Sequence, residues 1–247
     1  MVVETTRDQS EFVGVSSVER EQLHLLYRRS NVCGLKRLSA HLVLIVIAAV
    51  GVHQTETIQL YIPAAFVLGV VGTFLFAPLH ECIHRTAFRS RWLNDTVARV
   101  AGFLLLLPPR YFRSFHLSHH RHTQVSARDP ELVGKNVSTF GRYLIHVSGV
   151  LYWRDGIFIL IRHALGQVTA PFIGRTISQS IINEARCYLC IYVLLAVLSA
   201  MFQTSVLATF WLVPAILGQP ILRLYLLAEH TLCPVIPDML RNSRTTL

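Results

Sequence analysis

Four apolar stretches run through the chain in two closely spaced pairs. In the first pair, residues 38–52 and 58–79 flank a polar tip, and in the second, residues 187–202 and 206–227 flank only three polar residues. A membrane-spanning α-helix needs about 20 apolar residues, and the shortest stretch reaches this length if its flanking basic side chains extend to the interface. The pattern predicts an all-α membrane protein with four transmembrane helices arranged as two hairpins.

A fifth apolar stretch, residues 95–107, is too short to cross a membrane comfortably and stops at Pro108 and Pro109. We predict a re-entrant or interfacial helix here, because a crossing would place the histidine-rich segments before and after it on opposite sides of the membrane. The Arg-rich segment 110–184 contains amphipathic pieces and predicts a cytosolic helical cap that carries histidines.

The region before the first span is polar and differs from the rest. Residues 17–29 predict a short amphipathic helix that rests on the membrane surface. We therefore divide the chain into a cytosolic N-terminal segment, residues 1–37, and a membrane domain, residues 38–247.

Composition agrees with a multi-pass integral membrane protein. The 247 residues are 52% hydrophobic and 15% charged, and the mean hydropathy is +0.46. The formal charge of +9 suggests nucleic-acid binding, but the basic residues lie beside apolar segments without interleaved aromatic residues or a recognisable binding motif. We predict no nucleic-acid partner.

Orientation follows from the positions of the basic residues. Lys and Arg are frequent before the first span and after the second, whereas the tip at 53–56 has none. Because cytoplasmic loops carry the excess of Lys and Arg, this asymmetry places both termini and the histidine-rich segments on the cytoplasmic side.

Histidines recur at helical spacing next to the spans. His80 and His84 are four residues apart, and His116 lies three and four residues before His119 and His120. Residues at these spacings share a helix face, so two such faces can hold a metal ion between them. The competing interpretation is that these are interfacial polar residues.

Other residues extend this candidate metal site. His230 follows the last span on the same predicted face, and His122 could exchange roles with a neighbouring histidine. Glu81 and Glu229 could orient ligand histidines through hydrogen bonds, or pair with nearby Arg. Spacing alone does not select the metal, but oxidation of an unactivated carbon requires a redox-active ion such as iron rather than zinc.

Two motifs resemble the histidine boxes of the membrane fatty acid desaturase family. His80-Glu81-Cys82-Ile83-His84 is similar to its HxxxH box, and His116-Leu117-Ser118-His119-His120 to its HxxHH box. The stretches 84–88 and 228–231 also resemble this family, and the likeness extends from about residue 40 onward.

The resemblance implies a non-haem diiron centre that uses dioxygen to desaturate or hydroxylate lipid chains. It implies that electrons come from a cytochrome b5-like or ferredoxin-type partner. It also implies the iron ligands, which would be His80, His84, His116, His119 and His120, with His230 as a further ligand.

One departure from the family bears on activity. The family's third box, an HxxHH motif after the last span, does not occur in this sequence. Six histidines cannot fully ligate two irons without water or carboxylates, so we expect a truncated family member, or else a site completed unconventionally. We expect a fatty acyl desaturase; the alternatives are a fatty acid, alkane or carotenoid hydroxylase or ketolase, a non-catalytic metal-binding membrane protein, and an inactive fragment.

Overall fold

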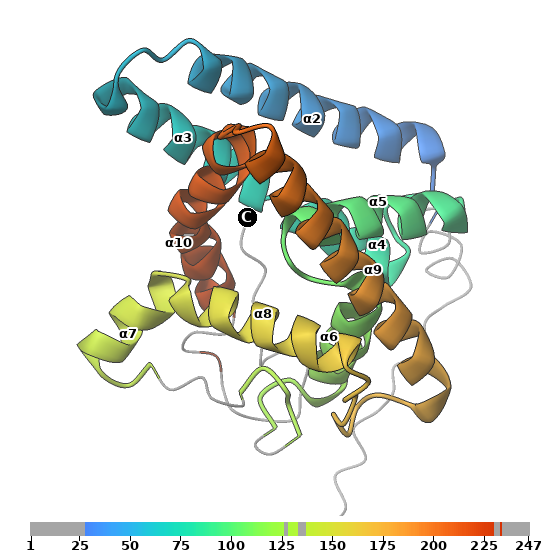
Figure 1. Ribbon diagram of the computed structural model, residues 1–247. Coiled ribbons are helices and arrows are strands. Elements are labelled where there is room, and N and C mark those ends of the chain that lie inside the picture. The colour runs from blue at the N-terminus through green and yellow to red at the C-terminus, as the bar shows by residue number, and fades with distance from the viewer. Residues whose placement is uncertain (1–27, 126–127, 133–136, 230–232, 234–247) are drawn as a thin grey trace, which may run out of the picture.

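The fold was analysed in a computed structural model, which describes residues 28–125, 128–132, 137–229 and 233. The described part is helical (Figure 1). In chain order its helices are α2 (Asn31–His53), α3 (Ile58–Thr73), α4 (Phe76–His84), α5 (Arg91–Leu104), α6 (Pro109–His122), α7 (Phe140–Val147), α8 (Val150–Ala164), α9 (Arg175–Met201), the π-helix η1 (Ala208–Leu212) and α10 (Val213–Ala228).

Four helical segments are long and apolar enough to cross a membrane. They are Asn31–His53, Ile58–His84, Arg175–Met201 and Ala208–Ala228. The prediction of an all-α protein with four transmembrane helices is confirmed. A fifth candidate arises only if α7 and α8, which are bent by 58° relative to each other, count as one span.

The helices extend beyond the apolar stretches from which they were predicted. Helix α9 begins at Arg175 instead of residue 187, because its polar first turns bury Ile181 and Ala185 inside the protein. The second span breaks at Phe74 and Leu75, between α3 and α4. There His41 Nε2 lies 2.8 Å from the carbonyl oxygen of Val71, so α2 helps to satisfy the backbone at the break.

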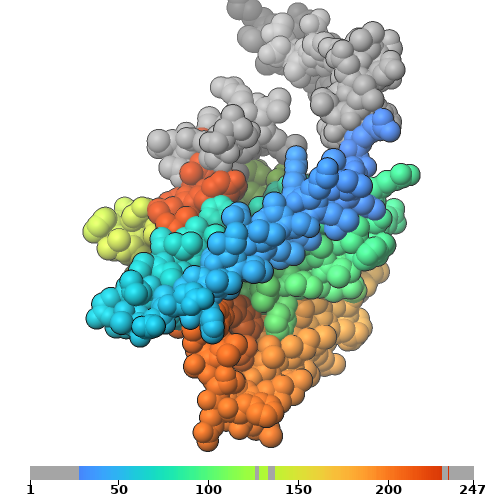
Figure 2. Space-filling model, turned by 90° about the horizontal axis from the view of Figure 1, so that it is seen from above, coloured from blue at the N-terminus to red at the C-terminus, as the bar shows by residue number. Residues whose placement is uncertain are grey.

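The first two spans form a hairpin on the outside of the molecule. Helix α2 packs along α3, and Figure 2 shows α2 lying across the face turned toward the viewer. Its exposed apolar side chains include Val46 and Ile47, which fits contact with lipid. In the second hairpin the arms diverge: α9 packs against α8, whereas α10 packs against α3 (Figure 1).

Helices α3 and α10 touch through two glycines. A Cβ atom on Gly69 would lie 1.9 Å from the Pro214 carbonyl oxygen, and one on Gly218 would lie 2.1 Å from the Gly69 carbonyl carbon. Small residues let helix backbones approach closely inside membranes, where packing drives association. This contact fixes α10 against the span that leads into α4.

Helix α5 ends inside the helical bundle, where aromatic side chains of other helices satisfy its last carbonyl groups. Tyr192 donates from its hydroxyl to the Phe103 oxygen at 2.6 Å, and Trp211 donates from Nε1 to the Leu104 oxygen at 2.9 Å. Tyr152 donates to the Leu105 oxygen. The final carbonyls of a helix lack partners within it, and leaving them bare in an apolar layer is costly. Side chains from α8, α9 and η1 therefore supply the donors that the end of α5 lacks.

Replacing Trp211 by Phe is expected to destabilise the protein by about 1–3 kcal/mol, because the partly buried Leu104 carbonyl loses its side-chain donor. Thermal unfolding in detergent micelles measures this. The matched control is Trp92→Phe, since Trp92 is 65% exposed at the start of α5. Equal unfolding temperatures for the two variants would contradict a role for the Trp211 hydrogen bond.

Some predictions fall outside the described residues. The amphipathic N-terminal helix lies almost wholly within residues 1–27, and His230 lies within 230–232; neither segment is among the residues that the structure describes. These predictions stay predictions.

Candidate metal centre

Helix α4 ends immediately after its second histidine. Arg85 follows in the left-handed conformation, with φ of 62°, and its N–H bonds back to the Cys82 carbonyl at 2.9 Å. The next turn is tied down by Asn94, whose buried amide donates to the Phe88 and Ser90 carbonyl oxygens. This turn leads the chain into α5 and leaves His80 and His84 on the last turns of α4.

Helix α6 carries the second histidine motif and begins at Pro109, a favourable residue for a first helical position. Proline has no N–H, so the first N–H group of the helix is that of Arg110, which donates to Glu184 Oε2 of α9 at 2.8 Å. A carboxylate at a helix N-terminus accepts from an N–H group that has no partner within the helix, and its negative charge interacts favourably with the positive end of the helix dipole. A spanning helix thus fixes the start of the helix that carries His116, His119 and His120.

The two motifs meet between α4 and α6. The ligand atoms of His80, His84, His116 and His120 all lie within 4.8 Å of one another; we call these residues the four-histidine group. His116 is central, because its ring centre lies 4.5, 5.0 and 4.3 Å from those of His80, His84 and His120. Four imidazole rings this close together could hold one metal ion between them.

The nitrogen atoms of the group suit a metal ion. Burial, followed by the neighbouring imidazoles of His80 and His120, lowers the pKa of His116 to about 2. The ring is therefore neutral at pH 7, as a metal ligand must be. The Nε2 atom of His84 is buried and has no hydrogen-bond partner within the described part of the chain. A metal ion would satisfy that atom.

His119 lies beside the group and makes a different contact. Its ring centre is 5.9 Å from that of His116 and 5.7 Å from that of His120. Its Nδ1 atom is 2.9 Å from Asp129 Oδ1, and both side chains are buried. Burial disfavours the Asp129 carboxylate, but hydrogen bonds from His119 and from the backbone N–H groups of Glu131 and Gln124 outweigh this and lower the pKa of Asp129.

The remaining predicted residues lie around this core. Glu81 Oε1 is 3.2 Å from His80 Nδ1, and Thr86 donates to Glu81 Oε2 at 2.6 Å, which is the arrangement expected of an orienting carboxylate. Glu229 follows α10 and lines the adjacent cavity. Among the residues that the structure describes, His122 is not part of the four-histidine group.

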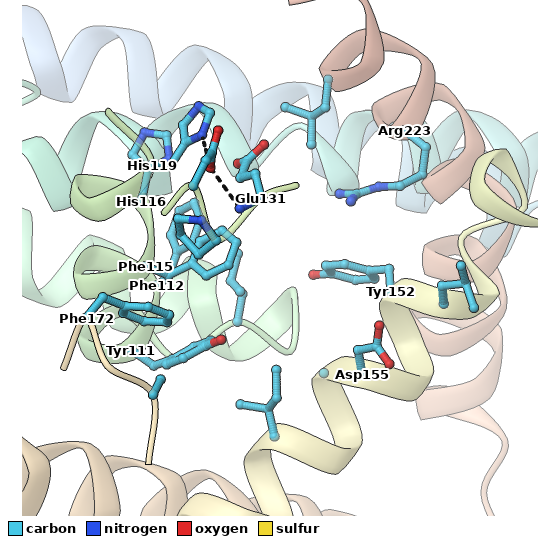
Figure 3. A pocket seen from close by; sticks show the side chains of 18 of the residues that line it. Tyr111, Phe112, Phe115, His116, His119, Glu131, Tyr152, Asp155, Phe172 and Arg223 are labelled. Carbon is cyan, nitrogen blue, oxygen red and sulfur yellow. Dashed lines mark hydrogen bonds and ion pairs between the residues drawn. The ribbon is translucent and has the colours of Figure 1, made fainter. Parts of the chain in front are cut away.

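A cavity of about 1510 Å³ opens beside the histidines (Figure 3). His80, His116, His119 and His120 line one part of it, and the wall below them is aromatic. Figure 3 shows Tyr111, Phe112, Phe115 and Phe172 on this wall, with Arg223 and Tyr152 across the cavity. The Arg223 guanidinium lies 4.6 Å from the centre of the Tyr152 ring. The cavity therefore has an aromatic wall next to the histidines, whereas charged side chains, among them Asp129 and Arg223, line other parts of it.

Sequence reasoning missed two residues that shape this site, Asp129 and Glu184, and indicated a third, Arg223, only as an ionisable residue at the end of the last span. Asp129 lies in a loop after α6, Glu184 on α9 and Arg223 on α10. Only Arg223 gave a signal, as an ionisable residue near the end of an apolar span, which is a functional candidate by default. No local pattern relates Asp129 or Glu184 to the histidines, since each reaches α6 through the tertiary fold.

A family model matches most of this chain, and known proteins resemble parts of it. The sequence model of the family described as fatty acid desaturase matches residues 56–247. The chain is 29% identical over 124 residues to the sn-1 oleoyl-lipid 12-desaturase of Picosynechococcus sp., an alignment that covers 46% of this chain and 36% of that protein. It is 34% identical over 80 residues to the Delta(12) fatty acid desaturase of Mortierella alpina, covering 32% and 20% of the two chains. The omega-6 fatty acid desaturase of the endoplasmic reticulum of Brassica juncea is 34% identical over 84 residues, covering 33% and 22%. The matched part of the chain thus spans about a third or less of the length of these relatives.

Proposed function

Because the chain belongs to the fatty acid desaturase family, we propose that it is a membrane-bound, dioxygen-dependent lipid oxidoreductase, and specifically a fatty acyl desaturase with a histidine-ligated diiron centre. The observation that carries this proposal is the four-histidine group, whose ligand atoms lie within 4.8 Å of one another beside a large cavity. Two of the helical segments long enough to cross a membrane, Ile58–His84 and Ala208–Ala228, contribute residues to the lining of this cavity.

The histidines fit iron by their donor chemistry. His80, His84, His116 and His120 would hold one metal position, and His119 and His230 are proposed as further ligands. Iron bound there supplies the redox chemistry with dioxygen that side chains alone cannot supply. Phe76 and Phe112 lie against His80 and His116, with ring centres 6.0 and 5.3 Å apart, and limit the access of water to them.

The cavity supports a lipid substrate. Its volume of about 1510 Å³ exceeds the roughly 300–1,000 Å³ of usual small-molecule sites. The aromatic wall can contact an acyl chain, and Arg223 across the cavity can face a polar head. An acyl chain held along this wall would have its methylene groups beside His116 and His119.

The reaction requires a partner. Converting two adjacent methylene groups to an alkene removes two hydrogens, and reduction of one dioxygen to two waters then needs two more electrons and two protons. We propose a cytochrome b5-like or ferredoxin-type donor. The distribution of Lys and Arg supports an orientation with both termini and the histidine motifs on the cytoplasmic side, where such donors occur.

Lipid analysis tests the proposal. The 247-residue chain is produced in a host whose membranes contain oleoyl lipids, together with an electron donor, and the acyl chains are analysed by mass spectrometry. We expect a second double bond that requires both dioxygen and His84, so the His84→Ala variant is the control. A hydroxylated product would favour a hydroxylase. Bound iron without any product would favour a metal-binding role. Neither iron nor product would favour an inactive protein.

A further inference from the structure

The four-histidine group has two sides, and the large cavity adjoins only one of them. His80, His116 and His120 contribute to the lining of the cavity, whereas His84 does not. His84 is the last residue of α4, and Arg85, which follows it, also lies outside the lining. A lipid bound in the cavity would therefore contact the proposed metal centre from one side, away from the end of α4.

Two arginine side chains lie on the His84 side of the group. Arg85 follows His84 directly, and its side chain is 40% exposed. Arg113 lies on the neighbouring helix α6, close enough for its charge to act on the His84 ring. Burial, followed by the nearby charge of Arg85, lowers the pKa of Arg113. Two guanidinium groups are thus held close together at the end of α4.

One carboxylate lies near the two guanidinium groups, and it balances their charge weakly. Asp95 Oδ1 is 4.0 Å from Arg85 Nη2, and its side chain is 46% exposed. An exposed ion pair of this length contributes little. The Nη1 atom of Arg113 is buried and has no hydrogen-bond partner among the residues that the structure describes. An unsatisfied buried donor is costly, so this pair of side chains favours a further anionic acceptor.

The surrounding segment adds positive charge. Between residues 85 and 113 the chain has six Arg, no Lys and one acidic residue, Asp95. Two of these Arg are exposed, in the turn that joins α4 to α5 and at the first position of α5, and α4 and α5 pack together (Figure 1). We call four residues of this region the arginine patch: Arg85, Arg89, Arg91 and Arg113.

We propose that the arginine patch is the docking surface for the electron donor, a small protein with an acidic surface. Each reduced donor would lose one electron to the metal centre and leave oxidised, so two donors are consumed for each double bond formed. Donor and lipid would approach the metal ligands from different sides, and neither would have to leave before the other binds. This inference rests on the proposed function.

The competing occupant is the phosphate group of an anionic lipid, because Arg85 directly follows a helical segment long enough to cross a membrane. Lipid phosphates bind wherever basic residues meet the membrane surface. They account for the positive charge of the patch but not for its position beside His84. An electron donor accounts for both, since electron transfer requires a close approach to the metal centre.

Binding to the metal-free chain tests the docking surface independently of iron. The purified 247-residue chain, in nanodiscs of phosphatidylcholine alone, is titrated with a plant-type 2Fe–2S ferredoxin of negative net charge. Cytochrome c, which is cationic, is the probe of opposite charge. The variants are Arg113→Gln and the double variant Arg85→Gln/Arg113→Gln. The matched control is Arg175→Gln, because Arg175 is exposed at the start of α9, outside the patch and outside the cavity lining.

We expect the double variant to bind ferredoxin at least about tenfold more weakly than the unmodified chain, since charge complementarity raises association rates by roughly 10–1,000-fold. Added salt should weaken binding to the unmodified chain more than binding to the double variant. We expect Arg175→Gln to bind like the unmodified chain, and cytochrome c not to bind. If the double variant does not fold, Arg85→Gln replaces it, because that side chain is partly exposed, and a smaller loss of the same kind is expected.

Reconstitution with iron adds a kinetic measurement. Reduction of the iron-loaded chain by ferredoxin should be at least about tenfold slower in the double variant, for the same electrostatic reason. Reduction by photoreduced 5-deazariboflavin, which is small and uncharged, should proceed at the same rate in both. An equal slowing with the two reductants would show that the substitutions disturb the metal centre and would overturn the docking role.

The binding results can also overturn the proposal. Unchanged ferredoxin binding in the double variant, an equal loss in Arg175→Gln, or equal binding of cytochrome c would do so. If added phosphatidylglycerol gathers around the unmodified chain but not around the double variant, while both bind ferredoxin equally, the patch binds lipid phosphate instead. Failure of the unmodified chain to take up iron would overturn the proposed function, and with it electron delivery through the patch, whereas the ferredoxin results alone overturn only the patch.

Discussion

Replacing His116 by Ala is expected to abolish stoichiometric metal binding. The ring centre of His116 lies within 5.0 Å of those of the other three members, and His116 makes the two shortest ring contacts of the group, at 4.5 Å to His80 and 4.3 Å to His120. Loss of an orienting partner alone costs about 10–100-fold in metal affinity, and loss of a central ligand should cost more. Metal content per chain, measured after reconstitution with iron(II), gives the result directly.

The matched control for this substitution is His122→Ala. His122 lies on the same helix but outside the four-histidine group, so this variant should retain its metal. Retention of full metal by His116→Ala, or loss of metal by His122→Ala alone, would contradict the proposed ligand set. Thermal unfolding of the metal-free variants separates a ligand effect from the cavity left by removing a buried ring.

Substituting Gly218 by Ala is expected to destabilise the protein by at least the roughly 1–3 kcal/mol of ordinary overpacking. The added Cβ would lie 2.1 Å from the Gly69 carbonyl carbon and 2.2 Å from its oxygen. These are backbone atoms that no rotamer change can move. Helices α3 and α10 would therefore have to separate, and the contacts along their shared length would weaken.

Helix α3 itself provides the control. A Cβ atom at Gly72 meets no atom within 4 Å, and Ala is favoured over Gly in a helix by roughly 0.5–1 kcal/mol. Gly72→Ala should thus unfold at the same or a higher temperature, while Gly218→Ala should unfold at a lower one. Equal unfolding temperatures in micelles would show that the close approach of α3 and α10 is dispensable.

The sequence was sufficient to predict the spans, because the cost of apolar surface in water and of bare backbone in lipid depends on local composition. The sequence was insufficient to predict the residues at which these helices begin and end. Helix α9 extends back to Arg175 through polar residues, and that extension is stabilised by burial of Ile181 and Ala185. Burial against distant segments cannot be recognised from the local hydropathy.

The candidate site was partly predictable for a related reason. Residues four apart on a helix differ by about 40° in direction and residues three apart by about 60° the other way, so the spacing allowed both His119 and His120 to lie near His116. In the structure His120 joins the group, with its Nε2 atom 2.8 Å from that of His116, while His119 is directed to Asp129. The choice between the two depends on where α4 and the loop after α6 lie, which is a property of the tertiary fold.

The buried end of α5 also has a consequence for how the chain is made. Its last carbonyls bond to Tyr192 and Trp211, which follow them in the chain by 89 and 107 residues. During synthesis, α5 and α6 leave the ribosome long before these donors exist. The end of α5 therefore cannot gain these hydrogen bonds until the second pair of candidate spans has been made. The histidines of α6 are therefore expected to come into register with those of α4 late in biogenesis, and loading of the proposed metal centre is expected to follow insertion of the second pair of spans.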